Sequence, residues 1–136
     1  MKNVKQYYKE LGKMVYAVAA ADGAIQEEER EKLHEFVLKE LAYNEQSSDS
    51  SGMNKAFYVD FEFDATEEKH PPINDVIKSY VRFVHANYEP KDDELIKNSV
   101  KLLESVAVAY SKKKEKEIID SVRHELKDVS RNILVN

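Results

Sequence analysis

Apolar side chains recur along most of this chain at intervals of three and four residues, the spacing that places them on one face of an α-helix. In the N-terminal segment the series runs from Val4 through Leu11 to Val18. The same spacing appears in four later stretches. The pattern predicts five helices, at about residues 2–21, 26–41, 73–88, 92–110 and 114–133.

The segment near residues 44–72 does not follow this spacing. It contains a run of small polar residues, Ser47–Gly52, which is typical of a loop. Four apolar side chains then alternate with intervening residues: Phe57, Val59, Phe61 and Phe63. A period of two predicts an irregular or extended segment with one aromatic face. That face either packs onto the helices as a lid or stays exposed as a partner-binding edge.

Composition narrows the fold class. The chain has 136 residues, of which 42% are hydrophobic and 35% charged, with three Gly, three Pro and no Cys. This length fits one domain over residues 1–136, and scarce Gly and Pro with abundant charge favour an all-α protein. The absence of Cys excludes thiol chemistry. A net charge of −5 argues against a general nucleic-acid binder.

Two apolar stretches resemble each other. Residues 14–21 align with residues 102–109, and each is followed by a charged turn and another predicted helix. The alignment predicts a compact bundle of two related helical hairpins plus a further helix. Residues 14–21 are too few to span a bilayer, so we expect no membrane insertion and a cytoplasmic protein.

The turn after the first helix carries the most informative motif, Ala-Ala-Asp-Gly-Ala-Ile over residues 20–25, followed by an acidic run. Gly23 can adopt the left-handed conformation that ends a helix, and Glu27–Glu29 suit the start of the next one. The spacing also matches the second half of an EF-hand loop. The first half does not match, because its leading ligand positions hold Val18 and Ala20.

The same residues resemble the hallmark of the TerB-like family, named for a bacterial tellurite-resistance protein. An apolar helix ending in Ala-Ala-Asp-Gly, an aliphatic residue, an acidic cluster and an amphipathic helix cover residues 11–41, and residues 91–130 fit more loosely. The resemblance implies an all-helical, non-enzymatic module of stress-response and membrane-associated complexes. It also implies a divalent-cation site, for Ca²⁺ or Mg²⁺, at Asp22, Glu28 and Glu29.

Two features differ from the family pattern. Gln26, a poor N-cap, stands where members often have Ser or Thr. The second hairpin has Lys112–Lys114 where the first has Asp-Gly, and these lysines would repel a cation. A cation site would therefore be one-sided unless Asp60, Glu62 or Asp64 completes it.

Our leading hypothesis is a protein-interaction or stress-response module that binds a protein partner and has no catalytic site. A divalent cation at the acidic turn is its candidate ligand. One alternative is a metal-dependent enzyme that uses Asp22, Glu28 and Glu29 with Asp60 or Asp64. Another is a helical homodimer with the Phe57–Phe63 segment at its interface. Residues 1–68 carry 8 basic and 15 acidic side chains, whereas residues 69–136 carry 13 and 11, so the acidic excess lies in the first half.

Overall fold

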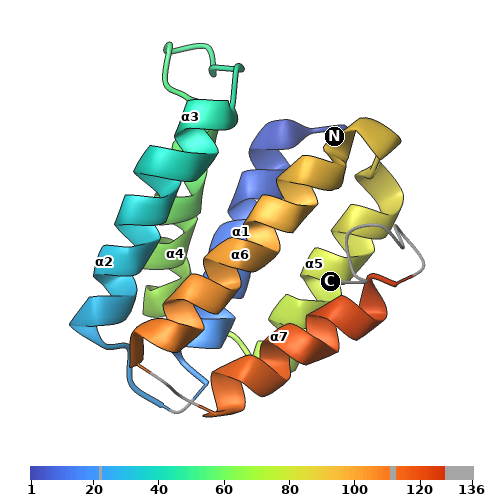
Figure 1. The fold of residues 1–136 in the computed structure, drawn as a ribbon. Coiled ribbons are helices and arrows are strands. Elements are labelled where there is room, and N and C mark those ends of the chain that lie inside the picture. The colour runs from blue at the N-terminus through green and yellow to red at the C-terminus, as the bar shows by residue number, and fades with distance from the viewer. Residues whose placement is uncertain (22, 111–112, 128–136) are drawn as a thin grey trace.

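The protein is a bundle of helices in the computed structural model, which describes residues 1–21, 23–110 and 113–127. These ranges contain no β-strand, and the predicted all-α fold is confirmed. No helix in them is both long enough and apolar enough to cross a membrane. The helices, shown in Figure 1, are α1 (Val4–Ala19), α2 (Glu27–Phe36), α3 (Ala42–Asn44), α4 (Tyr58–Lys69), α5 (Ile73–Asn87), α6 (Asp93–Tyr110) and α7 (Lys113–Glu125).

Helix α1 lies at the centre of the bundle and contacts α4, α5, α6 and α7 (Figure 1). Every side chain from Met14 to Ala19 is buried, and so are Tyr7, Tyr8 and Leu11 near its start. A helix that is apolar on all sides is stable in water only when neighbours cover all of them. The apolar run of the sequence is therefore the middle of the core.

The predicted extended segment is wrong for residues 58–69, which form helix α4. Val59 and Phe63 are buried, and Phe57 is half-buried against the same core. Residues four apart lie on one face of a helix, so the pair Val59 and Phe63 faces inward, whereas Phe61 projects outward and is 55% exposed. The alternation of apolar residues was compatible with a strand, but packing against α1 selects the helix.

Irregular structure is confirmed for residues 45–54, which connect α3 to a 3-10 turn before α4. The Asp49 carboxylate organises this loop. Its Oδ1 accepts hydrogen bonds from the backbone N–H and the hydroxyl of Ser51 and from the N–H of Met53, and its Oδ2 accepts one from the Tyr58 hydroxyl. These donors hold the pKa of Asp49 well below its usual range.

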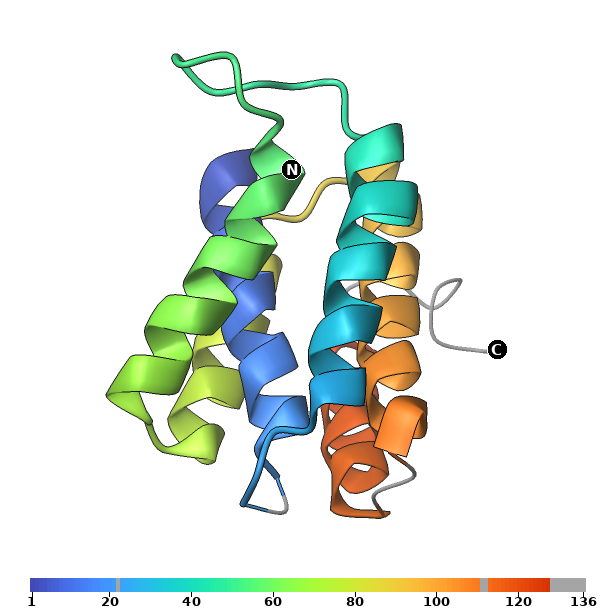
Figure 2. The ribbon, with the colours of Figure 1, turned by 90° about the vertical axis from the view of Figure 1, so that its left-hand side faces the viewer.

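The predicted turn at Gly23 is confirmed, and it lies between α1 and α2. Gly23 has a φ of 101°, and its N–H donates to the carbonyl of Ala20 at 2.9 Å. The two helices that it joins have different main neighbours, because α1 packs against α4 and α5 while α2 packs against α6. Figure 2 shows α4 in front of α1 and α2 in front of α6. The turn at Gly23 therefore joins two helices whose main packing partners are other helices.

Candidate functional site

The acidic turn begins α2, and one of its carboxylates serves the helix itself. Glu29 is only 1% exposed, and its Oε1 accepts a 2.8 Å hydrogen bond from the backbone N–H of Gln26. The N–H groups of a first helical turn lack partners within the helix, so this contact stabilises the start of α2. Gln26 is the N-cap residue of α2, and the bond from its N–H to Glu29, three residues further on, is the one that the acidic residue of a capping box makes.

The other predicted cation ligands are placed differently. Glu28 is exposed to solvent, whereas Glu29 is turned into the protein, and Asp22 lies outside the described residues. Within the described part of the chain, no three acidic or histidine side chains come together as a metal site requires. The cation site at Asp22, Glu28 and Glu29 therefore stays a prediction, with Glu29 already engaged as a helix cap.

Two polar contacts join α2 to α4. The Arg30 guanidinium donates to both carboxylate oxygens of Glu67, and one of these bonds measures 2.8 Å. Nearer the loop end, Nδ1 of His34 lies 2.9 Å from Oδ1 of Asp60. Burial raises the pKa of Asp60 above its usual value although His34 opposes this, while hydrogen bonding to Arg30 lowers the pKa of Glu67.

These contacts bear on the alternative of a carboxylate-rich catalytic centre. Asp60, proposed as an additional ligand, is engaged with His34, and Asp64 is exposed on the surface of α4. Asp60 and Glu67 of α4 thus each contact a side chain of α2, His34 and Arg30 respectively.

Of the four predicted partner-binding residues, Phe57, Val59, Phe61 and Phe63, only Phe61 has a largely exposed side chain. Its ring stands edge-on to that of Tyr58, with the ring centroids 6.1 Å apart. The ammonium groups of Lys5 and Lys9 lie 4.7 and 5.7 Å from the centroid of the Tyr58 ring, within range of a cation–π interaction. We call these four residues, from α1 and α4, the lysine–aromatic surface.

The sequence contained part of the signal for this surface. Lys5 and Lys9 are four residues apart, and Tyr58 and Phe61 are three apart, so each pair lies on one helix face. The extended interpretation of residues 57–63 concealed the second pair, because in a strand Tyr58 and Phe61 point to opposite faces.

Comparisons with known proteins leave the family open. No protein-family model, curated protein or solved structure matches the chain. The resemblance to the TerB-like family therefore stays a prediction that rests on the residues around Gly23.

Proposed function

We propose that this protein is a non-catalytic interaction module whose lysine–aromatic surface binds an acidic segment of a partner protein. The observation that carries the proposal is the 55% exposure of Phe61 beside Tyr58 and two lysines. Aromatic side chains supply much of the binding energy of protein interfaces, because each buries a large rigid area at a small entropic cost. A module of this kind agrees with what the TerB-like resemblance implies.

Charge determines the class of partner. Lys5 and Lys9 make no ion pair with an acidic side chain of the described residues, so both remain available to carboxylates. At this surface a basic partner would meet repulsion from the two lysines, whereas the carboxylates of an acidic partner would be attracted to them. An apolar residue beside the partner's carboxylates would cover Phe61.

The proposal is tested by NMR titration of the ¹⁵N-labelled protein with a short synthetic peptide that alternates glutamate and phenylalanine. Shifts should concentrate at the four residues of the surface. Phe61→Ala and the pair Lys5→Glu with Lys9→Glu should each weaken binding at least about fivefold, as expected for loss of a central aromatic or of a charge match.

Tyr43→Ala provides the matched control, because Tyr43 is an 83% exposed aromatic residue on α3. Its loss should leave peptide binding unchanged. A peptide of lysine and phenylalanine that binds equally well would contradict the proposal. So would shifts that lie elsewhere, or stronger binding to vesicles of anionic phospholipid than to the acidic peptide.

A further inference from the structure

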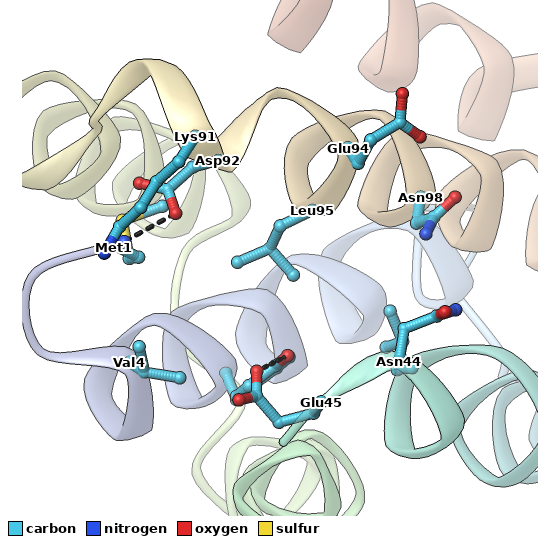
Figure 3. Close-up of a pocket in the computed structure, with 11 residues that line it drawn as sticks. Met1, Val4, Asn44, Glu45, Lys91, Asp92, Glu94, Leu95 and Asn98 are labelled. Carbon is cyan, nitrogen blue, oxygen red and sulfur yellow. Dashed lines mark hydrogen bonds and ion pairs between the residues drawn. The ribbon is translucent and has the colours of Figure 1, made fainter. Parts of the chain in front are cut away.

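The loop of residues 45–54 is fixed to two helices at its ends. At its start the Tyr8 hydroxyl of α1 donates a hydrogen bond to Glu45, a contact marked at Glu45 in Figure 3. Oε2 of Glu45 accepts hydrogen bonds from the backbone N–H and the hydroxyl of Ser47, at 3.1 and 2.7 Å. At the end of the loop the side-chain amide of Asn54 donates to the Glu45 carbonyl at 3.1 Å and to a carbonyl of α3 at 2.9 Å. The loop is thus held to α1 and α3.

Asp49, in the middle of this loop, links the loop to α4. Its Oδ1 accepts hydrogen bonds of 2.7 to 3.0 Å from Ser51 and Met53, which fix the carboxylate. Its backbone is fixed as well, because its N–H donates to the Met53 carbonyl at 2.8 Å and its carbonyl accepts the N–H of Gly52 at 3.0 Å. The other carboxylate oxygen, Oδ2, accepts a 2.7 Å hydrogen bond from the Tyr58 hydroxyl. The hydroxyl end of Tyr58 is therefore tied to a loop that two other helices hold.

The Tyr58 ring is the part of the lysine–aromatic surface that the other three residues share. The ammonium groups of Lys5 and Lys9 lie 4.7 and 5.7 Å from its centroid, and the Phe61 ring stands edge-on to it at 6.1 Å between centroids. These contacts all depend on the orientation of the ring, although the Tyr58 side chain is only half-buried. A side chain without close neighbours on every side can change rotamer unless a specific contact holds it. The hydrogen bond to Asp49 is such a contact.

We infer that Asp49 is a positioning residue of the lysine–aromatic surface. Its hydrogen bond orients the Tyr58 ring in the free protein, so that binding of the partner does not have to immobilise this side chain. Immobilising one side chain at an interface weakens binding by about two- to tenfold. Asp49 acts through Tyr58 and not through a contact with the partner. This role of Asp49 rests on the function proposed above.

NMR of the free protein measures the placement of the Tyr58 ring without any partner. The ammonium groups of Lys5 and Lys9 lie over the ring, so the ring current should shift the neighbouring ε-methylene protons upfield of those of a free lysine. Tyr58→Phe keeps the ring and removes only the hydroxyl. It should bring both lysine signals closer to those of a free lysine, and Asp49→Ala should do the same.

Calorimetric titration with the peptide of alternating glutamate and phenylalanine measures the effect on binding. Tyr58→Phe should weaken binding about threefold, because the ring must then be ordered when the peptide binds. In protein that already carries Asp49→Ala, Tyr58→Phe should have no further effect, because the hydrogen bond between the two residues is absent in both cases. Tyr58→Phe leaves the other hydrogen bonds of Asp49 in place, so it tests the role of the bond even if Asp49→Ala disturbs the loop.

Ser50→Ala is the matched control, because Ser50 is exposed in the same loop and its side chain forms no hydrogen bond with any residue that the structure describes. It should change neither the lysine signals nor the affinity for the peptide. Lysine signals or an affinity that Tyr58→Phe leaves unchanged, in a protein whose wild type binds the peptide, would overturn the role of Asp49 and leave the proposed function standing. A wild-type protein that does not bind the peptide would overturn both.

Discussion

The hydroxyl group of Tyr7 donates a hydrogen bond to Oγ of Ser99 at 2.6 Å, in the middle of the core where both residues are fully buried. Ser99 in turn donates to the carbonyl of Leu95 at 2.7 Å. Each hydroxyl has a single proton, so Tyr80, 2.9 Å from Tyr7, must be the donor in that contact. The chain of hydrogen bonds therefore has one direction, from α5 through α1 to α6.

This direction predicts unequal costs for two similar substitutions. Tyr7→Phe leaves the buried Tyr80 hydroxyl without its acceptor and should destabilise the protein by about 2–3 kcal/mol. Tyr80→Phe leaves Tyr7 with its acceptor on Ser99 and should cost only about 1 kcal/mol. Urea unfolding of both variants measures the difference. Equal costs would show that the hydroxyl protons do not run from Tyr80 through Tyr7 to Ser99.

Alkaline pH should act on the same residues. Burial raises the pKa of Tyr7 to about 12 from its ordinary value of 10, and burial also raises the pKa of Tyr80. The folded protein therefore holds these protons more tightly than the unfolded chain does. Stability is fully present below about pH 10 and is lost as the pH rises towards 12, by roughly 3 kcal/mol from Tyr7 alone.

Unfolding free energies measured between about pH 8 and pH 12, with tyrosinate absorbance followed in parallel, check this expectation. Tyr7→Phe is the control, since the loss of stability with rising pH should be shallower without that hydroxyl. A wild-type protein whose stability is constant up to pH 12, or a variant with the same slope, would contradict the assignment.

Helix positions were the most predictable part of the structure. Residues 73–88 and 92–110 were expected to be helical, and α5 and α6 span Ile73–Asn87 and Asp93–Tyr110. Both helices are amphipathic, so the periodicity of their apolar residues identifies them directly. In α4, by contrast, the alternation of Phe57, Val59, Phe61 and Phe63 also fits a strand, and only the helix places Phe61 on the face opposite Val59 and Phe63.

The candidate site was less predictable for a related reason. The lysine–aromatic surface exists only because α4 docks beside α1 and brings Tyr58 to Lys5 and Lys9. The packing of α4 on α1 is a tertiary contact, and the spacing of residues within either helix does not predict it. The role of Glu29 was hidden too, because adjacent glutamates are indistinguishable until one of them is buried.

The docking of α1 on α4 depends on Gly12. A Cβ atom at this position would lie 2.5 Å from the carbonyl oxygen of Val59 and 3.0 Å from Cβ of Glu62. Gly12→Ala should therefore push the two helices apart and destabilise the protein by about 1–3 kcal/mol. Helix propensity alone would favour alanine by about 1 kcal/mol, so the two effects have opposite signs.

Thermal or urea unfolding of Gly12→Ala decides between them. Lys97→Ala, at an exposed position of α6, is the control and should change stability by less than about 0.5 kcal/mol. An increase in stability in Gly12→Ala would mean that α1 and α4 are not in close contact at this point. A loss confined to Gly12→Ala would identify the glycine as the residue that permits the approach.

The two adjacent glutamates at the start of α2 distinguish a helix cap from a cation ligand. Glu29 is buried and accepts the N–H of Gln26, so Glu29→Ala should cost about 1–2 kcal/mol, as for other lost caps. Glu28 is exposed, and Glu28→Ala should change stability by less than about 0.5 kcal/mol. Urea unfolding in a chelator, and again with Ca²⁺ or Mg²⁺, measures both.

Measuring the stability of both variants with and without Ca²⁺ or Mg²⁺ separates the two roles. A cap acts through a hydrogen bond within the protein, so the loss in Glu29→Ala should be the same with and without the ion. A ligand that binds only the folded state adds about 2.7 kcal/mol at 100 times its dissociation constant. A loss that appears only when Ca²⁺ or Mg²⁺ is present, and that Glu28→Ala shares, would instead favour a cation site at this turn.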